Sequence, residues 1–326
     1  MRRSSVRSER WPLASAFVIS RGSKTEAEVV VAEIAEGGHR GRGEAVPYAR
    51  YGETTKGVLE QMISVQAQID AGAGRAELQG LLPPGAARNA LDCALWDLEA
   101  KQAGVRAWTL AGLARLDPVK TCYTISLASP GEMSRAAREN SRRPMLKLKI
   151  GGADDLTAVE AVRDSAPRSR LVVDANEALS FEDLRRLAPE FARLGVLVVE
   201  QPLAVGEDVV LDGYESPVPL CADESLHTRA ELGACVGRYA MVNIKLDKAG
   251  GLTEALALAA QAKAMGFAIM AGSMVSTSLG VAPAMILAQG AAVADLDGPL
   301  LLAHDREPGL AVTGSLLEAP VQELWG

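Results

Sequence analysis

The sequence predicts an α/β fold in which a (β/α)₈-type barrel follows a smaller α+β unit. The main observation is a series of eight short apolar runs between residues 121 and 298. They begin about 20 to 28 residues apart, which is the length of one strand, one helix and two loops. The composition agrees, because 48% of the residues are hydrophobic but only 4% are aromatic. A core built mainly from Ala, Val, Leu and Ile is typical of barrel strands and the helices that cover them.

Residues 1 to about 115 form the predicted α+β unit. The β-branched run at 28–36 (EVVVAEIAE) predicts a strand, and residues 41–46 can return beside it as a hairpin. Apolar residues at helical spacing then predict two helices, the second of which has Gly104 where a C-terminal cap is needed. These two helices are predicted over residues 54–69 and 86–103.

The eight apolar runs share one property, because nearly all of them end in polar side chains. In a barrel the carboxyl ends of the strands carry the active site, and a buried parallel strand otherwise consists of continuous Val, Ile and Leu. Polar strand ends therefore indicate a functional site. The runs are residues 121–126, 145–150, 171–176, 197–201, 220–225, 241–246, 268–273 and 293–298.

Charge and cysteine content exclude several classes of function. The 34 Lys and Arg and 41 Asp and Glu give a net charge of −7, with no basic tract beyond the first ten residues, so no nucleic-acid partner is expected. The four cysteines lack the spacing of a disulfide framework or a zinc site.

The apolar run at 11–19 is short and is broken by Pro12 and Ser15. We therefore expect a cytoplasmic protein with neither a leader nor a membrane span.

Three carboxylates end neighbouring runs. Asp174, Glu200 and Asp223 end the third, fourth and fifth predicted strands, which lie side by side in a barrel. Left unpaired, the three would repel one another and lose hydration at high cost. Oxygen-only ligands favour a hard divalent ion such as Mg²⁺. Separate salt bridges to loop arginines are the alternative, but three acidic strand ends in succession favour the metal.

Lysines occur on two predicted strands that oppose each other across the barrel. Lys147 and Lys149 are two residues apart, so both face the interior if one does, and two neighbouring ammonium groups lower each other's pKa. A lowered pKa suits a general base at neutral pH. Lys245 ends the sixth run, opposite the second, so a central substrate would lie between Lys149 and Lys245. The alternative, in which the first two lysines face solvent, fits the apolar residues of the run poorly.

Two further carboxylates end the eighth run. Asp295 and Asp297 share one strand face, and with three other carboxylates on the metal they are free to bind a substrate ammonium. Their alternative role is that of helix N-caps. None of the three histidines ends a run, and neither a nucleophile elbow nor a phosphate-binding loop is present.

Five short motifs in a fixed order identify a family resemblance. GRGEAVP at 41–47 and ARNALDCALWDLEAK at 87–101 belong to the same resemblance, which therefore extends over almost the whole chain. The chain strongly resembles the enolase superfamily, muconate-lactonizing-enzyme subgroup. The five motifs are KLK at 147–149, DAN at 174–176, EQP at 200–202, ADES at 222–225 and NIK at 243–245.

This resemblance implies a domain organisation. The expected fold is a modified (β/α)₇β barrel over residues 116–303, preceded by an α+β capping domain over residues 1–115. Residues 304–326 are expected to return toward the capping domain as a C-terminal segment.

The resemblance also implies a cofactor and a chemistry. One Mg²⁺ per subunit is expected, and an α-proton of the substrate is removed while the metal stabilises the enediolate. Lys149 and Lys245 would be the bases, and Lys147 would assist them. The expected metal ligands and the residues beside them are Asp174, Glu200 and Asp223, with Asn176 and Glu224.

The pair Asp295 and Asp297 narrows the resemblance to the dipeptide epimerases, in which such a pair binds the α-ammonium of the dipeptide. RGSKTEAEVVV at 21–31 is similar to the L-Ala-D/L-Glu epimerases, in which a cation of this loop meets the glutamate side chain. Those members carry arginine where this chain has Lys24, and lysine keeps the charge but loses the bidentate fork. A preference for glutamate with relaxed specificity is therefore expected. Further residues expected near the peptide are Thr124, Ser126, Gly272, Ser273 and Met274.

The predicted function is epimerisation of an L-Ala-Glu-type dipeptide in cell-wall peptide metabolism, by a homo-oligomer with no macromolecular partner. The second candidate is another reaction of the subgroup, namely cycloisomerisation, o-succinylbenzoate synthesis or N-acylamino-acid racemisation. Asp295 and Asp297 discriminate between the two, because those other substrates carry no ammonium. A binding protein without catalysis is the third candidate, and opposed bases around a metal would serve it little.

Overall fold

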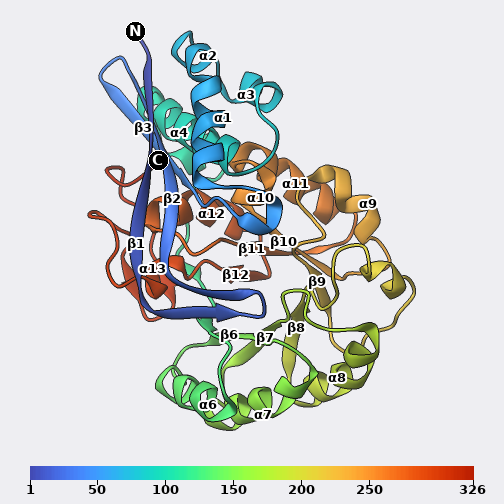
Figure 1. The fold of residues 1–326 in the computed structure, drawn as a ribbon. Helices are drawn as coiled ribbons and strands as arrows, with labels where there is room; N and C mark the ends of the chain where they lie inside the picture. The colour runs from blue at the N-terminus through green and yellow to red at the C-terminus, as the bar shows by residue number, and fades with distance from the viewer.

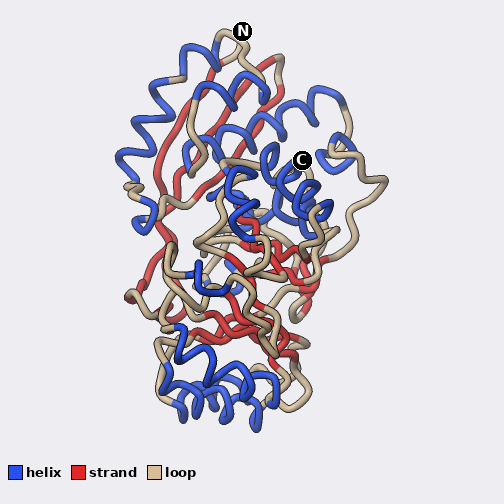
Figure 2. Tube along the Cα trace, turned by 90° about the vertical axis from the view of Figure 1, so that its right-hand side faces the viewer, coloured by secondary structure: helices blue, strands red, loops and turns tan.

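The computed structural model describes residues 1–326 and has two parts, an N-terminal cap domain and a parallel barrel (Figure 1). A three-stranded antiparallel sheet and several helices form the cap domain, and eight parallel strands form the barrel. Figure 2 shows the long cap strands rising from the barrel beside the cap helices, with another group of helices below the barrel strands. None of the helices combines the length and the hydropathy that crossing a bilayer requires.

The cap sheet is a meander of three antiparallel strands. β2 lies in the middle, and its run Val29–Val31 is fully buried. Gly37 and Gly38 both have positive φ (61° and 83°), which is the conformation that a two-residue hairpin turn requires. The predicted hairpin is therefore confirmed. The three strands are β1 (Arg3–Ile19), β2 (Gly22–Glu36) and β3 (His39–Ala45).

The sequence does not predict β1. This strand lies at the edge of the sheet, its side chains are exposed or half-buried, and it contains Pro12. Its register with β2 shifts between Pro12 and Phe17. Beyond that shift the tip of the β1–β2 hairpin reaches over the barrel, where Leu127 N donates to Val18 O at 3.0 Å. The hairpin tip is therefore part of the surroundings of the barrel's carboxyl end.

Helix α4 (Ala86–Ala103) packs directly on the cap sheet. A Cβ on Gly41 would lie 2.1 Å from the carbonyl oxygen of Ala94, and a Cβ on Gly43 would lie 2.1 Å from that of Ala90. Only glycine permits so close an approach of β3 to the helix.

The other cap helices depart in part from the prediction. Gly104, with φ 66°, ends α4 as predicted. The single helix predicted over 54–69 is interrupted at Val65 and forms two helices, and the sequence does not predict α3. The remaining helices of the cap domain are η1 (Ala49–Tyr51), α1 (Thr55–Ser64), α2 (Gln66–Asp70), α3 (Arg75–Leu81) and α5 (Ala107–Leu110).

The barrel contains all eight predicted strands. They form one parallel sheet in sequence order from β5 to β12. The first and last strands meet where Cys122 N donates to Ala294 O at 2.9 Å, next to a parallel bridge between Thr121 and Ala294. The strands are β5 (Tyr123–Ile125), β6 (Met145–Lys149), β7 (Arg170–Asp174), β8 (Val196–Glu200), β9 (Leu220–Ala222), β10 (Met241–Lys245), β11 (Ala268–Gly272) and β12 (Val293–Asp295).

Helices cover the outside of the barrel. Ser129 and Ser180 begin α6 and α8 with capping boxes, which satisfy the first free N–H groups of each helix. Only short helical turns lie between β8 and β9 and between β9 and β10. The helices are α6 (Pro130–Glu139), η2 (Ala153–Asp155), α7 (Leu156–Ser165), α8 (Phe181–Arg193), η3 (Asp208–Leu211), η4 (Arg229–Glu231), α9 (Leu232–Cys235), α10 (Leu246–Ala249), α11 (Leu252–Ala264), α12 (Ser278–Ala288) and α13 (Gly298–Leu301).

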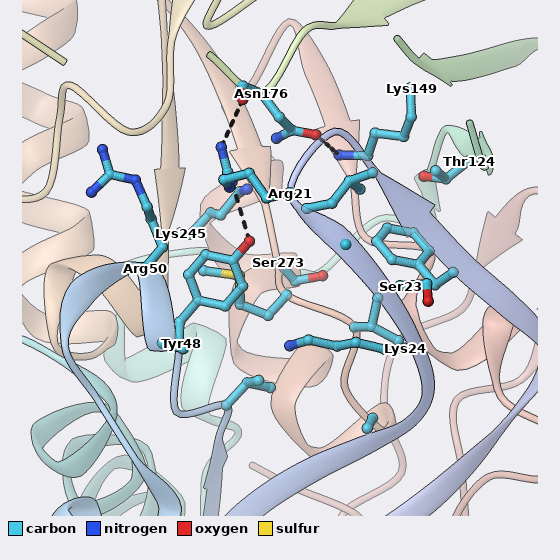
Figure 3. A pocket seen from close by; sticks show the side chains of 18 of the residues that line it. Arg21, Ser23, Lys24, Tyr48, Arg50, Thr124, Lys149, Asn176, Lys245 and Ser273 are labelled. Carbon is cyan, nitrogen blue, oxygen red and sulfur yellow. Dashed lines mark hydrogen bonds between the residues drawn. The ribbon is translucent and has the colours of Figure 1, made fainter. Parts of the chain in front are cut away.

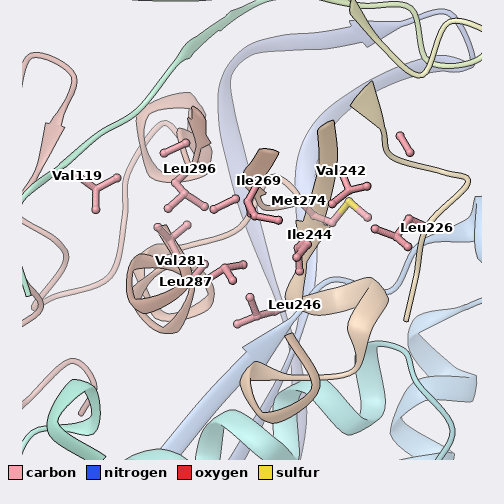
Figure 4. Close-up of a cluster of buried hydrophobic side chains, with 14 of the residues drawn as sticks. Val119, Leu226, Val242, Ile244, Leu246, Ile269, Met274, Val281, Leu287 and Leu296 are labelled. Carbon is pink, nitrogen blue, oxygen red and sulfur yellow. The ribbon is translucent and has the colours of Figure 1, made fainter. Parts of the chain in front are cut away.

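The barrel has an apolar core on both sides of its strands. On the outside, the strands and helices share a continuous cluster of 67 buried residues that extends into the cap domain. Figure 4 shows part of it, with Val281 and Leu287 of α12 near Ile269 and Ile244 of the strands. Inside, one apolar layer receives a side chain from each of the eight strands or from the residue before it. The layer consists of Cys122, Met145, Val172, Val198, Cys221, Met241, Met270 and Val293.

Residues near position 326 return to the cap domain. Trp325 is fully buried, and its Nε1 donates to Cys93 O at 3.0 Å. Gly326 N donates to Asp97 Oδ1 at 2.6 Å, so both residues contact α4. Three short strands precede this contact, namely β4 (Val119–Lys120), β13 (Val312–Thr313) and β14 (Leu316–Leu317).

Candidate active site

The inward faces of the barrel strands change from apolar to polar toward their carboxyl ends. Side chains at i and i+2 share one face of a strand. Met145 of the apolar layer is therefore followed inside the barrel by Lys147 and Lys149, and Val172 is followed by Asp174. All the polar side chains of this end are buried, and they are Thr124, Lys147, Lys149, Asp174, Glu200, Asp223, Asn243, Lys245, Asp295 and Asp297.

Lys147 lies among three carboxylates. Its Nζ is 2.6 Å from Glu200 Oε2, 2.6 Å from Asp295 Oδ2 and 3.0 Å from Asp174 Oδ2. Burial would lower the pKa of Lys147, but Asp174, Asp295 and Glu200 outweigh burial and raise the pKa well above its ordinary value. The prediction that Lys147 and Lys149 lower each other's pKa is therefore wrong for Lys147, because three carboxylates outweigh one neighbouring ammonium group.

Glu200 is the carboxylate with the least compensation. Burial and the nearby Asp174 raise the pKa of Glu200 to about 8, although Lys147 opposes them. Its Oε1 accepts a hydrogen bond from Asn243 Nδ2 at 2.6 Å, but Oε2 accepts no well-aligned hydrogen bond. A buried carboxylate whose pKa stays raised although Lys147 Nζ lies 2.6 Å from its Oε2, and which is close to Asp174 and Asp223, fits a divalent cation that binds oxygen ligands.

Asp223 is held by two lysines. Lys245 Nζ donates to Oδ2 at 2.7 Å, and Lys248 Nζ donates to Oδ1 at 2.6 Å. Lys248 is almost fully buried, and it also donates to the backbone oxygen of Asp223 and, at 3.0 Å, to that of Asn243. The three predicted metal ligands do not form an ion-binding cluster by themselves, because lysine ammonium groups pair with their oxygens. They lie at one end of the barrel, where Lys147 links Asp174 with Glu200 and where Lys245 and Lys248 pair with Asp223.

Lys149 and Lys245 occupy opposite walls of the barrel. They belong to β6 and β10, which are four strands apart among eight. Lys149 Nζ donates to Asp174 Oδ2 at 2.6 Å and to Asn176 Oδ1 at 3.1 Å. Burial would lower the pKa of Lys245, but Asp223 and Glu200 outweigh it and raise the pKa. Two amines on opposite walls can remove and deliver protons on opposite faces of one substrate carbon.

Asp295 and Asp297 differ in their surroundings. Asp295 is not free, contrary to the prediction, because its Oδ2 accepts a hydrogen bond from Lys147 Nζ, while its Oδ1 has no partner. Asp297 Oδ2 accepts a hydrogen bond from Thr124 N at 2.6 Å. Burial and the neighbouring Asp295 raise the pKa of Asp297 to about 6. A cationic group placed between the two would relieve this repulsion.

A cavity of about 400 Å³ lies between the cap hairpin and the carboxyl end of the barrel. Lys24 is exposed at this cavity, and its Nζ lies 5.1 Å from the centre of the Tyr48 ring (Figure 3). Ser126 does not line the cavity but accepts a hydrogen bond from Val18 N at 3.3 Å and so fixes the hairpin to the barrel. The predicted residues that line the cavity are Lys24, Thr124, Lys147, Lys149, Asn176, Asp223, Glu224, Lys245, Ser273, Met274, Asp295 and Asp297.

Among the other residues of the cavity wall are four polar or aromatic cap residues to which the sequence assigns no role, namely Arg21, Tyr48, Arg50 and Tyr51. The partners of Arg21 lie 155 to 203 residues further along the chain, except for Tyr48. No local spacing distinguishes such a residue from an ordinary solvated arginine. Only the motif RGSK at 21–24, which begins with Arg21 itself, indicates that this part of the hairpin belongs to the site.

Two family models match the chain. Residues 1–112 match the model described as "Mandelate racemase / muconate lactonizing enzyme, N-terminal domain". Residues 132–313 match the model described as "Enolase C-terminal domain-like". The two matches correspond to the cap domain and to most of the barrel.

Curated relatives are similar over nearly their full length. The chain is 46% identical to the L-Ala-D/L-Glu epimerase of Escherichia coli K12 over 315 residues, which is 96% of this chain and 98% of that protein. It is 42% identical to the N-acetyl-D-glutamate racemase of a Pseudoalteromonas species over 302 residues, which is 91% of this chain and 95% of that protein.

Solved structures share the whole fold. An enolase family member from Agrobacterium tumefaciens with homology to dipeptide epimerases, with bound sodium and L-Ala-L-Glu, superposes with a TM-score of 0.98 at 49% identity and covers 100% of both chains. The dipeptide epimerase from Enterococcus faecalis V583, complexed with Mg and L-Leu-L-Tyr, gives a TM-score of 0.90 at 28% identity and covers 98% of this chain and 96% of that chain.

Proposed function

The chain belongs to the mandelate racemase/muconate lactonizing enzyme group of the enolase superfamily, and we propose that it is a Mg²⁺-dependent dipeptide epimerase. The proposed substrate is L-Ala-D/L-Glu or a related dipeptide, and the reaction is a 1,1-proton transfer at the α-carbon of its C-terminal residue. The observation that carries this proposal is the pair Lys149 and Lys245, which line one cavity from opposite walls of the barrel.

The two lysines exchange one proton for another. One neutral amine removes the α-proton from its face of the substrate, and the opposite ammonium delivers a proton to the other face. Between these steps the α-carbon is planar, because its electron pair is shared with the carboxylate. The number of protons on enzyme and substrate together is conserved, and the configuration is inverted. Lys147, between Asp174, Glu200 and Asp295, supplies fixed positive charge beside Lys149.

Asp174, Glu200 and Asp223 would hold one Mg²⁺ per subunit. The raised pKa of the Glu200 carboxyl group, and its Oε2 that accepts no well-aligned hydrogen bond, support this assignment. When bound, the ion supplies electrostatic stabilisation of the charge that develops on the substrate carboxylate. Asn176 and Glu224 lie beside the proposed ligands, with Asn176 N donating to Asp174 Oδ1 at 3.0 Å.

The remaining residues select the substrate. Asp295 and Asp297 would bind its α-ammonium, and Thr124, Ser273 and Met274 would contact the peptide. Lys24 would meet the carboxylate of a glutamate side chain. Lysine presents a point charge rather than a bidentate fork, so we expect a preference for glutamate over apolar residues that is modest rather than strict.

A second candidate is racemisation of an N-acylated amino acid, and the 42% identical N-acetyl-D-glutamate racemase favours it. N-Acetylation of the dipeptide separates the two. Acetylation removes the ammonium and leaves Asp295 and Asp297 facing each other without a cation, so kcat/KM should fall by about 10²-fold or more. Equal turnover of N-acetylglutamate and the free dipeptide would favour the racemase.

The principal test follows each epimer by NMR in D₂O. Lys149→Ala should abolish net epimerisation yet leave Lys245 able to exchange the α-proton of one epimer with deuterium. Lys245→Ala should leave only exchange of the other epimer. A single variant that epimerises at nearly the wild-type rate would exclude the two-base reaction. If both variants retain exchange of the same epimer, the lysines do not flank the substrate.

Three further assignments are part of the proposal. We place the protein in the cytoplasm, consistent with four buried cysteines that form no disulfide. We expect a homo-oligomer that needs no partner other than its substrate. The domain limits are residues 1–115 for the cap, 116–303 for the barrel and 304–326 for the returning segment.

A further inference from the structure

The turn after β7 has a backbone conformation that is costly for its residues. Asn176 has φ 43° and Glu177 has φ 69°, so two successive non-glycine residues adopt left-handed conformations. Such conformations are uncommon for residues other than glycine and persist only where the surroundings hold them in place. The turn lies two residues after Asp174 and carries the side chain that contacts Lys149.

Two arginines from the cap domain hold this turn. Arg21 Nη1 donates to the backbone oxygen of Asn176 at 2.8 Å and to Glu177 Oε2 at 3.1 Å, and its Nη2 donates to Glu224 Oε1 at 2.7 Å. Arg50 binds both carboxylate oxygens of Glu177 at 2.8 Å. Both carboxylates are largely buried, so these ion pairs are less screened than ordinary surface pairs.

The same turn carries one of the two hydrogen-bond acceptors that orient Lys149, the other being Asp174 Oδ2 at 2.6 Å. Asn176 Oδ1 accepts a hydrogen bond from Lys149 Nζ at 3.1 Å, and Asn176 N donates to Asp174 Oδ1 at 3.0 Å. Figure 3 shows the resulting chain of contacts from Tyr48 through Arg21 and Asn176 to Lys149. A shift of the turn would therefore move one of the two acceptors and turn the Lys149 ammonium toward Asp174.

Lys245 is positioned by other contacts. It donates to Asp223 Oδ2 at 2.7 Å, and Lys248 independently fixes the other oxygen of that carboxylate. Asp223 N also donates to Gln201 Oε1 at 2.8 Å. Arg21 reaches this side only through Glu224, the neighbour of Asp223. The hydrogen bond of Lys245 thus comes from the barrel alone, whereas Lys149 is held both by Asp174 of the barrel and by a turn that the cap domain braces.

We propose that Arg21 is a positioning residue that acts through the Asn176–Glu177 turn on Lys149 and leaves Lys245 nearly unaffected. This inference rests on the proposed two-base reaction and adds to it that the cap hairpin helps to align one of the two bases. Arg50, which contacts Glu177 but not Asn176, gives weaker support to the same turn.

The test measures α-proton exchange of each epimer separately in D₂O, for Arg21→Ala and Arg21→Lys. The epimer served by Lys149 is identified beforehand as the one that Lys149→Ala no longer exchanges. Arg21→Ala should lower the kcat of exchange for that epimer by about tenfold or more, because a small displacement of the base is costly. The kcat of exchange for the other epimer should change by about threefold at most. Arg21→Lys should restore only part of the loss, because one ammonium cannot donate to Asn176 and Glu224 as the guanidinium does.

Arg42→Ala is the matched control. Arg42 also lies in the cap domain, but its guanidinium donates to the backbone oxygens of Glu323 and Leu324 rather than to the turn. It should affect the two epimers equally, and calorimetric titration with Mg²⁺ should give similar affinities for wild type, Arg42→Ala and Arg21→Ala.

A double-mutant cycle tests the path from Arg21 to Lys149. Asn176→Gly removes the side-chain contact with Lys149 and suits a positive φ. If Arg21 acts through Asn176, adding Arg21→Ala to Asn176→Gly should cause little further loss. Equal losses for both epimers, or full additivity in this cycle, would overturn the inference. Absence of α-proton exchange by the wild-type protein would instead refute the proposed function itself.

Discussion

The two ends of the barrel interior are built from the same eight strands but have opposite character. At the amino end a layer of Cys, Met and Val side chains, one per strand, is buried without any charge. A second layer, one or two inward positions further along each strand, contains ammonium and carboxylate groups that are also buried. On β7 the change occurs within one step, from Val172 to Asp174. The comparison shows how one scaffold separates its structural residues from its chemical ones.

At the charged end, neighbouring lysines offset the burial of the carboxylates to different degrees. Burial would raise the pKa of Asp174, but Lys147 and Lys149 outweigh burial and hold it below its ordinary range. Burial of Glu200 is not offset, and its pKa rises to about 8. Buried ion pairs seldom stabilise a fold more than apolar residues of the same volume. The apolar layer should therefore carry stability, and the charged layer should carry activity.

The largest effect should come from Glu200→Gln, which keeps the hydrogen bond from Asn243 but removes the charge. We expect kcat/KM to fall by about 10³-fold or more, on the scale of electrostatic stabilisation by a metal. The raised folded-state pKa means that ionised Glu200 destabilises the metal-free fold, increasingly as pH rises from about 4.5 to 8. The metal-free variant should consequently melt no lower than wild type at pH 8. A clearly lower melting temperature would assign a structural role to the charged layer.

Acidification should have the next largest effect, through Asp297. Its pKa of about 6 implies that the carboxylate needed for the ammonium is present above pH 6 and lost below it. The substrate ammonium stays protonated throughout this range, so kcat/KM should fall about tenfold between pH 7 and pH 5. The same profile recorded for Asp297→Asn should lack this decline. A decline that persists in the variant would show that another group titrates.

A smaller effect is expected at the exposed edge of the cavity. Lys24→Ala should lower kcat/KM for dipeptides that end in glutamate by about fivefold at most, because an exposed ion pair contributes little. Dipeptides with an apolar second residue should be affected less. Rates for L-Ala-L-Glu and L-Ala-L-Leu, measured side by side, check this. Equal losses for the two would mean that Lys24 does not contact the side chain.

The smallest effect on activity should accompany a large effect on stability. Met270 belongs to the apolar layer and is fully buried. Met270→Ala should cost about 2–5 kcal/mol of unfolding free energy, since it removes buried methylene groups and leaves a cavity. At a temperature where the variant is folded, kcat/KM should stay within about twofold of wild type. Denaturant unfolding and steady-state rates measured together would reveal any coupling between the two layers.

The sequence predicts the barrel and its charged end because both depend on local pattern. Each strand is a short apolar run, and period-2 spacing places Lys147 with Lys149, and Asp295 with Asp297, on one face. The order of the strands in the sheet then brings residues distant in sequence to one end. Eight strands and the charged residues at their carboxyl ends follow from this pattern, whereas Ser126 and Gly272 were expected near the peptide and do not line the cavity.

The cap contacts could not be predicted in the same way. β1 is an exposed edge strand with Pro12 and many charges, so it lacks the apolar signal of a core strand. Arg21 and Lys248 each make several contacts, mostly with residues that only the complete fold brings near them. The sequence also does not predict that carboxylates surround Lys147. Spacing along a strand shows which side chains are neighbours, but it does not show whether the charges around a lysine raise or lower its pKa.

The return of the chain to its beginning has a consequence for how the molecule folds. The indole of Trp325 donates to Cys93 O across 232 residues of intervening sequence, and Arg42 is bonded to the backbone near it. Contacts of such separation require the entropy of closing a very long loop before they stabilise anything. The cap domain should therefore remain loosely packed until the barrel has formed, and residues 1–112 expressed alone should exchange their backbone amides rapidly. The order of assembly would then be the reverse of the order in the sequence.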